Sequence, residues 1–257
     1  MSGPIRYPWV MLSRLKYLAL VLVVAAGLGL TVAPAPAADD GLKVVELFTS
    51  QGYSSCPPAD ALLADLADRD DVLALSFHVD YWDYIGWKDP FASPLHTQRQ
   101  KVYRQVFGNR YVYTPQMVVN GTFEMTGTDR ARSLARIDAA PGPDRVSLAM
   151  RDDGAGTVTV SVPRTADADP ATLWLVVYDD EHLTAVKRGE NRGRTIRNRN
   201  VVRGLQRIAM WHGQALEQPM MISELAPDGG DSCAVLLQSQ RTGRIMAAAR
   251  VALTSMR

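Results

Sequence analysis

The segment at residues 44–60 constrains the fold of this chain more than any other part of the sequence. It starts with the mostly apolar, β-branched run Val44–Phe48, passes through a short turn with glycine and serine, and reaches Cys56 and two prolines. A run of this kind predicts a buried strand. Proline is favoured in the first turn of a helix, because that turn does not use the missing N–H group. The segment therefore predicts a strand-to-helix junction with a cysteine where the helix begins.

This layout is typical of a thioredoxin-type redox site, in which two cysteines flank two residues between a strand and a helix. Tyr53 stands where the first cysteine would be, so the junction reads Tyr-Ser-Ser-Cys. In the two-cysteine cycle the first thiol attacks and the second resolves the mixed disulfide. Cys56 alone predicts either monothiol chemistry or a packed cysteine in a degenerate site. Tyr53, Ser54 and Ser55 are the residues that shape this turn, and both serines are candidates to cap the helix.

The first 38 residues predict a targeting segment. Three basic residues precede the apolar run 18–30, and small residues lead from there to Asp39. This order is typical of a cleaved secretory signal peptide, and the run is shorter than the ~20 residues that span a bilayer. The sequence thus predicts a periplasmic or secreted protein without a stable membrane span after cleavage, with an uncleaved anchor as the alternative. The net charge of +1 over 257 residues gives no indication of a nucleic-acid partner.

The region after the junction predicts a parallel pair of strands. An apolar stripe at helical spacing covers 59–66, and a second apolar strand follows at 72–79. Strand, helix and strand of these lengths form a βαβ unit. A second helix is expected to begin at Ser93-Pro94, with Leu95, Val102, Tyr103, Val106 and Phe107 as its buried positions. Asn120-Gly121 then predicts a tight hairpin.

The Pro-Gly-Pro sequence at 141–143 is the best candidate for a domain boundary. Beyond it, short β-rich runs alternate with turns, and helical periodicity is weak. The predicted fold is therefore an α/β thioredoxin-like domain at 39–140, followed by a β-sandwich-like domain at 144–257.

Several motifs in the first half give this chain a family resemblance. The matching residues are Glu46–Gly52, Ser54–Asp60, Ser76–Tyr84, Gly86–Phe91 and Tyr113–Gly121. With them the chain resembles DUF1223, a family of secreted thioredoxin-like proteins of unknown function. The resemblance covers most of residues 42–257 and implies a thioredoxin-like domain followed by a β-rich one. The family pattern has cysteine where this chain has Tyr53, which puts a two-thiol redox cycle in doubt.

The resemblance also implies a peptide groove at Thr114-Pro115. In thioredoxin-like folds a cis proline lies against the active-site turn, and the residue before it offers backbone groups to an extended peptide. Only about 5–6% of X–Pro bonds are cis, so the bond type alone favours trans. The fold context reverses this expectation, and we expect Pro115 to be cis.

Glu46 and the residues around His78 are candidates for proton transfer and for metal binding, respectively. Glu46 lies on the strand that leads to the turn and is a candidate proton shuttle for Cys56 if buried near it, or else a solvated or ion-paired carboxylate. His78, Asp80 and Asp83 suit metal ligands by type, and His78 and Asp80 share one strand face. A hydrogen-bonded His–Asp pair that orders the aromatic loop is the favoured interpretation. The sequence predicts neither a metal nor a cofactor.

Three other features leave alternatives open. The aromatic residues of 81–91 form either a binding rim or the small core of a loop. The basic stretch 187–199 forms either a site for an anion, an acidic partner or lipid headgroups, or a solvated hairpin, which is favoured. Cys233 is expected to be a buried thiol, although the oxidising compartment also permits a bridge to Cys56.

The leading functional hypothesis is thiol/disulfide-related monothiol chemistry or peptide thiol binding at Cys56, with an oxidoreductase-like activity if the site is active. The alternative is a non-catalytic periplasmic binding or scaffold module that has lost redox activity. The expected partner in either case is an extended peptide or a protein thiol or disulfide. Burial of Cys56 separates the two hypotheses, because a buried thiol is inert.

Overall fold

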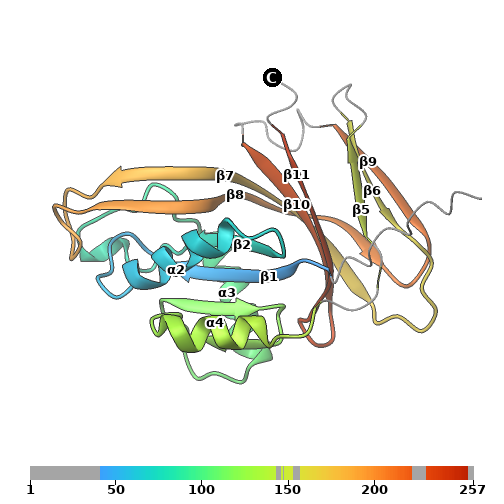
Figure 1. Ribbon diagram of the computed structural model, residues 1–257, viewed down its shortest axis with the longest axis horizontal. Helices are drawn as coiled ribbons and strands as arrows, with labels where there is room; N and C mark the ends of the chain where they lie inside the picture. The colour runs from blue at the N-terminus through green and yellow to red at the C-terminus, as the bar shows by residue number, and fades with distance from the viewer. Residues whose placement is uncertain (1–40, 143–145, 147, 153–156, 222–229, 254–257) are drawn as a thin grey trace, which may run out of the picture. The chain divides into compact units, whose positions relative to one another are not determined.

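The computed structural model describes residues 41–142, 146, 148–152, 157–221 and 230–253. These residues form a mixed α/β fold with one large mixed sheet and few helices (Figure 1). No helix within them is both long enough and apolar enough to cross a membrane. The signal peptide predicted for residues 1–38 lies outside the described residues.

The first part of the chain contains the predicted βαβ unit and hairpin. Its elements are β1 (Lys43–Thr49), α2 (Pro57–Ala67), β2 (Val72–His78), η1 (Asp83–Ile85), α3 (Pro94–Val106), β3 (Gln116–Val119), β4 (Phe123–Met125) and α4 (Arg130–Asp138). Strand β1 pairs in parallel with β2 and antiparallel with β3, and β3 pairs antiparallel with β4. Asn120 and Gly121 both have positive φ, at 48° and 63°, in the short loop between Val119 and its partner Phe123, and Asn-Gly is the residue pair that favours such a turn. The parallel pair and the hairpin are therefore confirmed.

The second part of the chain is β-rich, as predicted. Its elements are β5 (Ala149–Asp152), β6 (Thr157–Val162), β7 (Ala171–Ala185), β8 (Thr195–Trp211), β9 (Leu216–Met221), β10 (Ser232–Ser239) and β11 (Ile245–Ala252). A small sheet has the order β5-β6-β9, and the main sheet has the order β11-β10-β7-β8-β2-β1-β3-β4.

The long β7–β8 hairpin makes the main sheet continuous across the two parts. Strand β7 has 15 residues and β8 has 17, about three times the usual strand length of 5–6. Strand β8 pairs in parallel with β2, where Val201 lies opposite Ser76. The division into domains at 141–143 stays a prediction, but the strands on both sides of it share one sheet.

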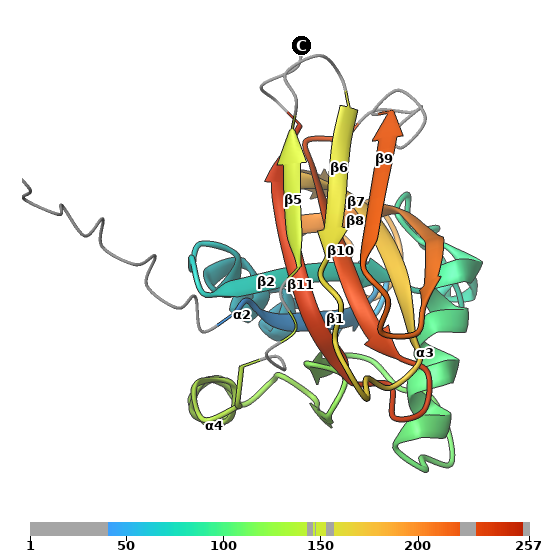
Figure 2. The ribbon, with the colours of Figure 1, turned by 90° about the vertical axis from the view of Figure 1, so that its right-hand side faces the viewer.

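The two faces of the main sheet carry different layers. Val45 and Leu47 of β1 pack with α2 and α4, whereas Val44 and Phe48 pack on the side of Tyr103 from α3. Figure 2 shows α3 and α4 on opposite sides of the sheet. Successive side chains of a strand point to opposite faces, so residue parity along β1 and β2 decides which helix each side chain meets.

The buried positions predicted for α3 are right for Tyr103, which is 1% exposed, and for Phe107, which is partly buried, but wrong for the three aliphatic residues. Leu95, Val102 and Val106 are 61%, 48% and 40% exposed. The residues that α3 buries are mostly polar: His96, Thr97, Arg99, Gln100 and Tyr103. The sheet presents polar side chains to α3. Because buried polar groups need hydrogen-bond partners, the helix turns its polar residues toward the sheet.

Candidate functional site

Cys56 is buried at the point where the chain passes from β1 to α2. It is the N-cap residue of α2, and its backbone N–H donates to the Tyr53 carbonyl at 3.2 Å. Its side chain is 0% exposed. Burial, and secondarily the nearby Asp60, raise the pKa of Cys56 to about 12. The helix N-terminus favours a thiolate, but desolvation is the larger effect, and Cys56 is a neutral thiol at neutral pH.

An aromatic pair connects the turn to the segment after β2. The rings of Tyr53 and Trp82 stack with centroids 4.1 Å apart and an interplanar angle of 6°. The Trp82 indole Nε1 donates to the Thr114 hydroxyl at 2.7 Å. Hydrogen bonding from Thr114 also favours the Cys56 thiolate, although it does not outweigh burial. The structure thus brings Tyr53, Cys56 and Thr114 close together.

The bond between Thr114 and Pro115 is cis, which confirms the expectation for this position. Thr114 is nearly buried, at 8% exposure. Among the described residues, no hydrogen bond reaches its backbone N–H or C=O, because β3 begins only at Gln116. These two backbone groups are available to a partner.

A buried acid lies one helical turn from Cys56. Asp60 accepts a hydrogen bond from the Thr49 hydroxyl at 2.8 Å, and its other carboxylate oxygen has no hydrogen-bond partner. Burial raises the pKa of Asp60 to about 7, although the nearby His78 opposes the shift. The sequence held a signal for this residue, since positions i and i+4 of a helix lie on one face.

His78 forms a buried ion pair with Asp89, at 2.8 Å between Nδ1 and Oδ2. Despite burial, the Asp89 carboxylate raises the pKa of His78, and His78 in turn lowers the pKa of Asp89. The same carboxylate accepts from the Gln51 backbone at 2.8 Å. His78 is therefore paired with an aspartate, but the predicted partner is wrong: the acid is Asp89, whereas Asp80 accepts a hydrogen bond from the Thr97 hydroxyl at 2.6 Å. Within the described part of the chain, no group of three or more His, Cys, Asp or Glu residues is arranged to hold a metal ion.

Glu46 is not brought to Cys56. It is fully buried, forms an ion pair with Arg99 and accepts a hydrogen bond from Tyr103. Both partners belong to α3, which covers the opposite face of the sheet from α2. The period of two along β1 gives Glu46 the face of Val44 and Phe48. The carboxylate beside the thiol is that of Asp60 instead.

The end of the β7–β8 hairpin packs against the cysteine turn, which the sequence did not indicate. Ser54 donates to a Glu190 carboxylate oxygen from its backbone N–H at 2.9 Å and from its hydroxyl at 2.7 Å. The fully buried Asn191 donates to the carbonyls of Gln51 and Tyr53, both at 3.0 Å. The hairpin is therefore solvated only in part: most of its charged side chains are exposed, but Arg199 is mostly buried and the loop is bound to the turn through Glu190 and Asn191.

Both serines were candidates to cap α2, and neither does. The helix begins without a side-chain capping bond. Ser54 is engaged by Glu190 instead, and Ser55 is exposed. Two prolines in the first turn reduce the number of N–H groups that a cap has to satisfy.

No disulfide joins Cys56 and Cys233. Both cysteines are buried, but they belong to different layers of the protein. Cys233 lies on β10 opposite Val177, within an apolar cluster that also contains Leu175 and Leu237. Cys233 is thus a buried core thiol, as expected.

Fold and site together define a mixed α/β protein whose strand-to-helix turn carries one buried cysteine. Residues 44–238 match the family model described as Protein of unknown function (DUF1223), and the chain belongs to that family. It is also similar to a crystal structure of a structural-genomics target protein from Agrobacterium tumefaciens. The two chains are 32% identical, with a TM-score of 0.72, over 82% of this chain and 94% of the other. No curated protein matches the chain.

Proposed function

We propose that this protein is a thioredoxin-like binding module that takes an extended peptide beside Thr114-Pro115 and does not carry out thiol–disulfide exchange. The strand order β2-β1-β3-β4, with β1 and β2 parallel and a hairpin of β3 and β4, supports the thioredoxin-like part. The β-sandwich-like second domain is a proposal of the same kind, with β5, β6 and β9 as its separate sheet.

The burial of Cys56 carries this proposal. The thiolate is the nucleophile in exchange reactions. With a pKa of about 12, the thiolate of Cys56 is roughly 10⁵-fold less abundant than the thiol at pH 7. The Tyr53 position supplies no second thiol to resolve a mixed disulfide. Monothiol chemistry is therefore less well supported than binding.

The peptide partner is supported by the backbone of Thr114. An extended peptide binds by pairing its own N–H and C=O groups with unpaired groups on the protein. The N–H and C=O of Thr114 have no partner among the described residues, while its hydroxyl is held by Trp82. Because its side chain is held in this way, Thr114 offers a peptide backbone groups that are already in position for binding.

Timed thiol labelling of the folded protein, with mass spectrometry to locate the adduct, tests the proposal. We expect Cys56 to remain unlabelled up to pH 8.5 and to be labelled only after denaturation, which serves as the control for reagent access. Rapid labelling of Cys56 in the folded protein below pH 8.5, the ordinary value for a thiol, would overturn the proposal in favour of a live monothiol site.

We further propose that the protein is exported and works in the periplasm or outside the cell. The order of basic, apolar and small residues in 1–38 supports export. N-terminal sequencing of the protein isolated from its host tests this. A mature chain that starts near Asp39 is expected, and an intact N-terminus on a cytoplasmic protein would contradict export.

A further inference from the structure

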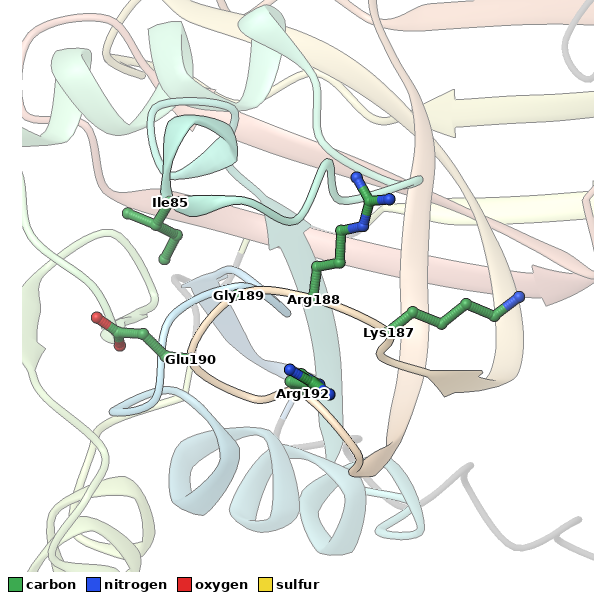
Figure 3. A pocket seen from close by; sticks show the side chains of 6 residues that line it. All are labelled: Ile85, Lys187, Arg188, Gly189, Glu190 and Arg192. Carbon is green, nitrogen blue, oxygen red and sulfur yellow. The ribbon is translucent and has the colours of Figure 1, made fainter.

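A cleft lies beside the cysteine turn, between η1 and the loop that joins β7 and β8. Its volume is about 580 Å³. Figure 3 shows the residues that line it: Ile85, Lys187, Arg188, Gly189, Glu190 and Arg192. A cleft of this size is large enough for part of a peptide or a small molecule.

The cleft has an excess of uncompensated positive charge. Lys187, Arg188 and Arg192 are exposed and have no ion-pair partner among the described residues. Further along the same hairpin three arginines are compensated: Arg197 pairs with Glu181, Arg199 with Asp68, and Arg203 with Asp179. The carboxylate of the cleft, Glu190, is already occupied by two hydrogen bonds from Ser54, which lower its pKa.

The loop that carries these cations is fixed to the turn. Asn191 donates to two turn carbonyls, and the Glu190 N–H donates to the Gly52 carbonyl at 3.3 Å. Gly189 has a φ of +74°, and a Cβ there would lie 3.0 Å from the Cβ of Trp87. The close approach of loop and aromatic segment therefore requires glycine. A fixed loop presents its charges without a further ordering cost on binding.

The directions in which Lys187, Arg188 and Arg192 point indicate which kind of anion the cleft suits. Figure 3 shows Lys187, Arg188 and Arg192 leaving the loop in different directions. A single phosphate or carboxylate is held best by donors that converge on it. Cations that diverge match negative charges spread along a chain. Ile85 adds an apolar contact inside the cleft, and Tyr84 next to it is 78% exposed.

The cleft is close to the proposed peptide site. Gly52, in the same turn as Tyr53, lies near Ile85 of the cleft, since a Cβ on it would be 3.5 Å from the Ile85 side chain. Tyr53 stacks on Trp82, and Trp82 donates to Thr114. A chain of direct contacts thus joins the cleft to the residue that offers free backbone groups.

We propose that this cleft binds acidic side chains of an extended peptide whose backbone is held at Thr114, so that the protein selects peptides rich in Asp and Glu. This inference rests on the proposed peptide-binding function and adds the class of peptide. Charge complementarity of this kind sets specificity and association rate, and it weakens with salt.

Selection from a displayed library of random peptides tests the inference on the full chain. Peptides of about ten residues span roughly 33 Å when extended, enough to reach beyond the cleft. We expect the recovered peptides to be enriched in Asp and Glu. For the most enriched peptide, affinity is then measured for the protein and for the variant Lys187→Glu/Arg188→Glu/Arg192→Glu. We expect this variant to bind about tenfold more weakly at low salt, with a smaller difference at high salt.

A matched variant controls for net charge. Lys101→Glu/Arg164→Glu/Arg207→Glu changes the same residue types at exposed positions outside the cleft, and we expect it to bind within about twofold of the unchanged protein. Circular dichroism of both variants checks that they fold. Equal binding by both triple variants would overturn the inference.

The outcomes separate this inference from the proposed function. Recovered peptides without an acidic excess, bound equally by the protein and the cleft variant, would overturn the inference and leave peptide binding in place. Recovery of no peptide would overturn both. Binding of inorganic phosphate or of anionic phosphatidylglycerol vesicles in place of any peptide, lost in the cleft variant, would show that the cleft takes a different anion and would also overturn the inference.

Discussion

At the scale of the residue, one pair of positions decides the chemistry of this site. Cys56 is the N-cap residue of α2, and Tyr53 stands three residues before it, at the position where a C-x-x-C sequence has its first cysteine. The Tyr53 ring is fixed on Trp82. The position of Cys56 was predictable from the strand, turn and proline pattern. Its burial was not, because the residues that pack on the turn, among them Trp82, Thr114 and Asn191, are distant in the sequence.

Restoring the missing thiol tests how much of an exchange site remains. We expect Tyr53→Cys to create insulin reductase activity, because it places a second thiol at the edge of the turn, next to Cys56 in the C-x-x-C order. Tyr53→Ser loses the same stacking contact, worth about 0.5–1.5 kcal/mol, without adding a thiol, and is expected to be inactive. A folded Tyr53→Cys variant without activity would show that the surroundings of the turn no longer support exchange.

Asp60 makes the stability of the protein depend on pH. Its folded pKa of about 7 lies above its ordinary value of 3.8, so the folded state binds the proton more tightly than the unfolded state. The stability due to this group is therefore present below pH 4 and is lost as pH rises through 7. Asp60→Asn removes the titration. We expect the free energy of unfolding of this variant, relative to that of the unchanged protein, to rise by about 2–3 kcal/mol between pH 5 and pH 8.

Urea unfolding at the two pH values measures this difference. Asp65→Asn on the same helix is the control, because Asp65 is exposed in a surface ion pair with Arg130, and such pairs contribute little. A pH-independent difference for Asp60→Asn would mean that Asp60 titrates normally in the folded protein.

At the scale of the element, α3 shows why pattern alone misplaced a helix face. The rule that apolar side chains are buried assumes an apolar surface beneath the helix. Under α3 the sheet presents Glu46, and the helix supplies Arg99 and Tyr103 to it. Gln238 of β10 also donates to the Tyr103 hydroxyl at 3.0 Å. The helix itself was predictable from Ser93, Pro94 and the spacing, but its orientation depended on a charged residue in another element.

Breaking this buried ion pair is expected to cost much more than breaking an exposed one. Arg99→Met leaves the Glu46 carboxylate buried without its cation, and we expect a loss of about 3–5 kcal/mol in the free energy of unfolding. The double variant Glu46→Gln/Arg99→Met is expected to recover part of this loss. Arg130→Met, which breaks an exposed pair with Asp65, should cost less than about 1 kcal/mol. Equal losses in urea unfolding for the two single variants would contradict a buried network.

At the scale of the whole molecule, local and distant pairings differ in how far sequence predicts them. The parallel β1–β2 pair and the β3–β4 hairpin follow from short-range patterns, so both were predicted. The pairing of β8 with β2 joins residues as far apart as Ser76 and Val201. A local sequence pattern does not predict the register of such a distant pair. The sequence therefore did not predict which part of the protein the basic stretch 187–199 packs against. The anchoring of its loop on the cysteine turn comes from this distant pairing.

If the hairpin keeps the turn closed, loosening it will expose Cys56 without unfolding the protein. Asn191 is fully buried and donates to the carbonyls of Gln51 and Tyr53. Asn191→Ala leaves both carbonyls without this donor, and an unsatisfied buried polar group costs about 1–3 kcal/mol. We expect Cys56 to be labelled roughly 5- to 150-fold faster in this variant than in the unchanged protein, because a loss of about 1–3 kcal/mol in the stability of the closed turn raises the population of the open turn by that factor.

The control is a variant that loses stability elsewhere. Leu237→Ala removes a fully buried side chain from the apolar cluster of β10, and such truncations cost about 2–5 kcal/mol. This change weakens the whole fold at least as much as Asn191→Ala does, without touching the turn. Faster labelling of Cys56 in Asn191→Ala than in Leu237→Ala would show local opening. Equal acceleration in the two variants would mean that Cys56 is reached only by global unfolding, and that the hairpin holds the turn no more closely than the rest of the fold does.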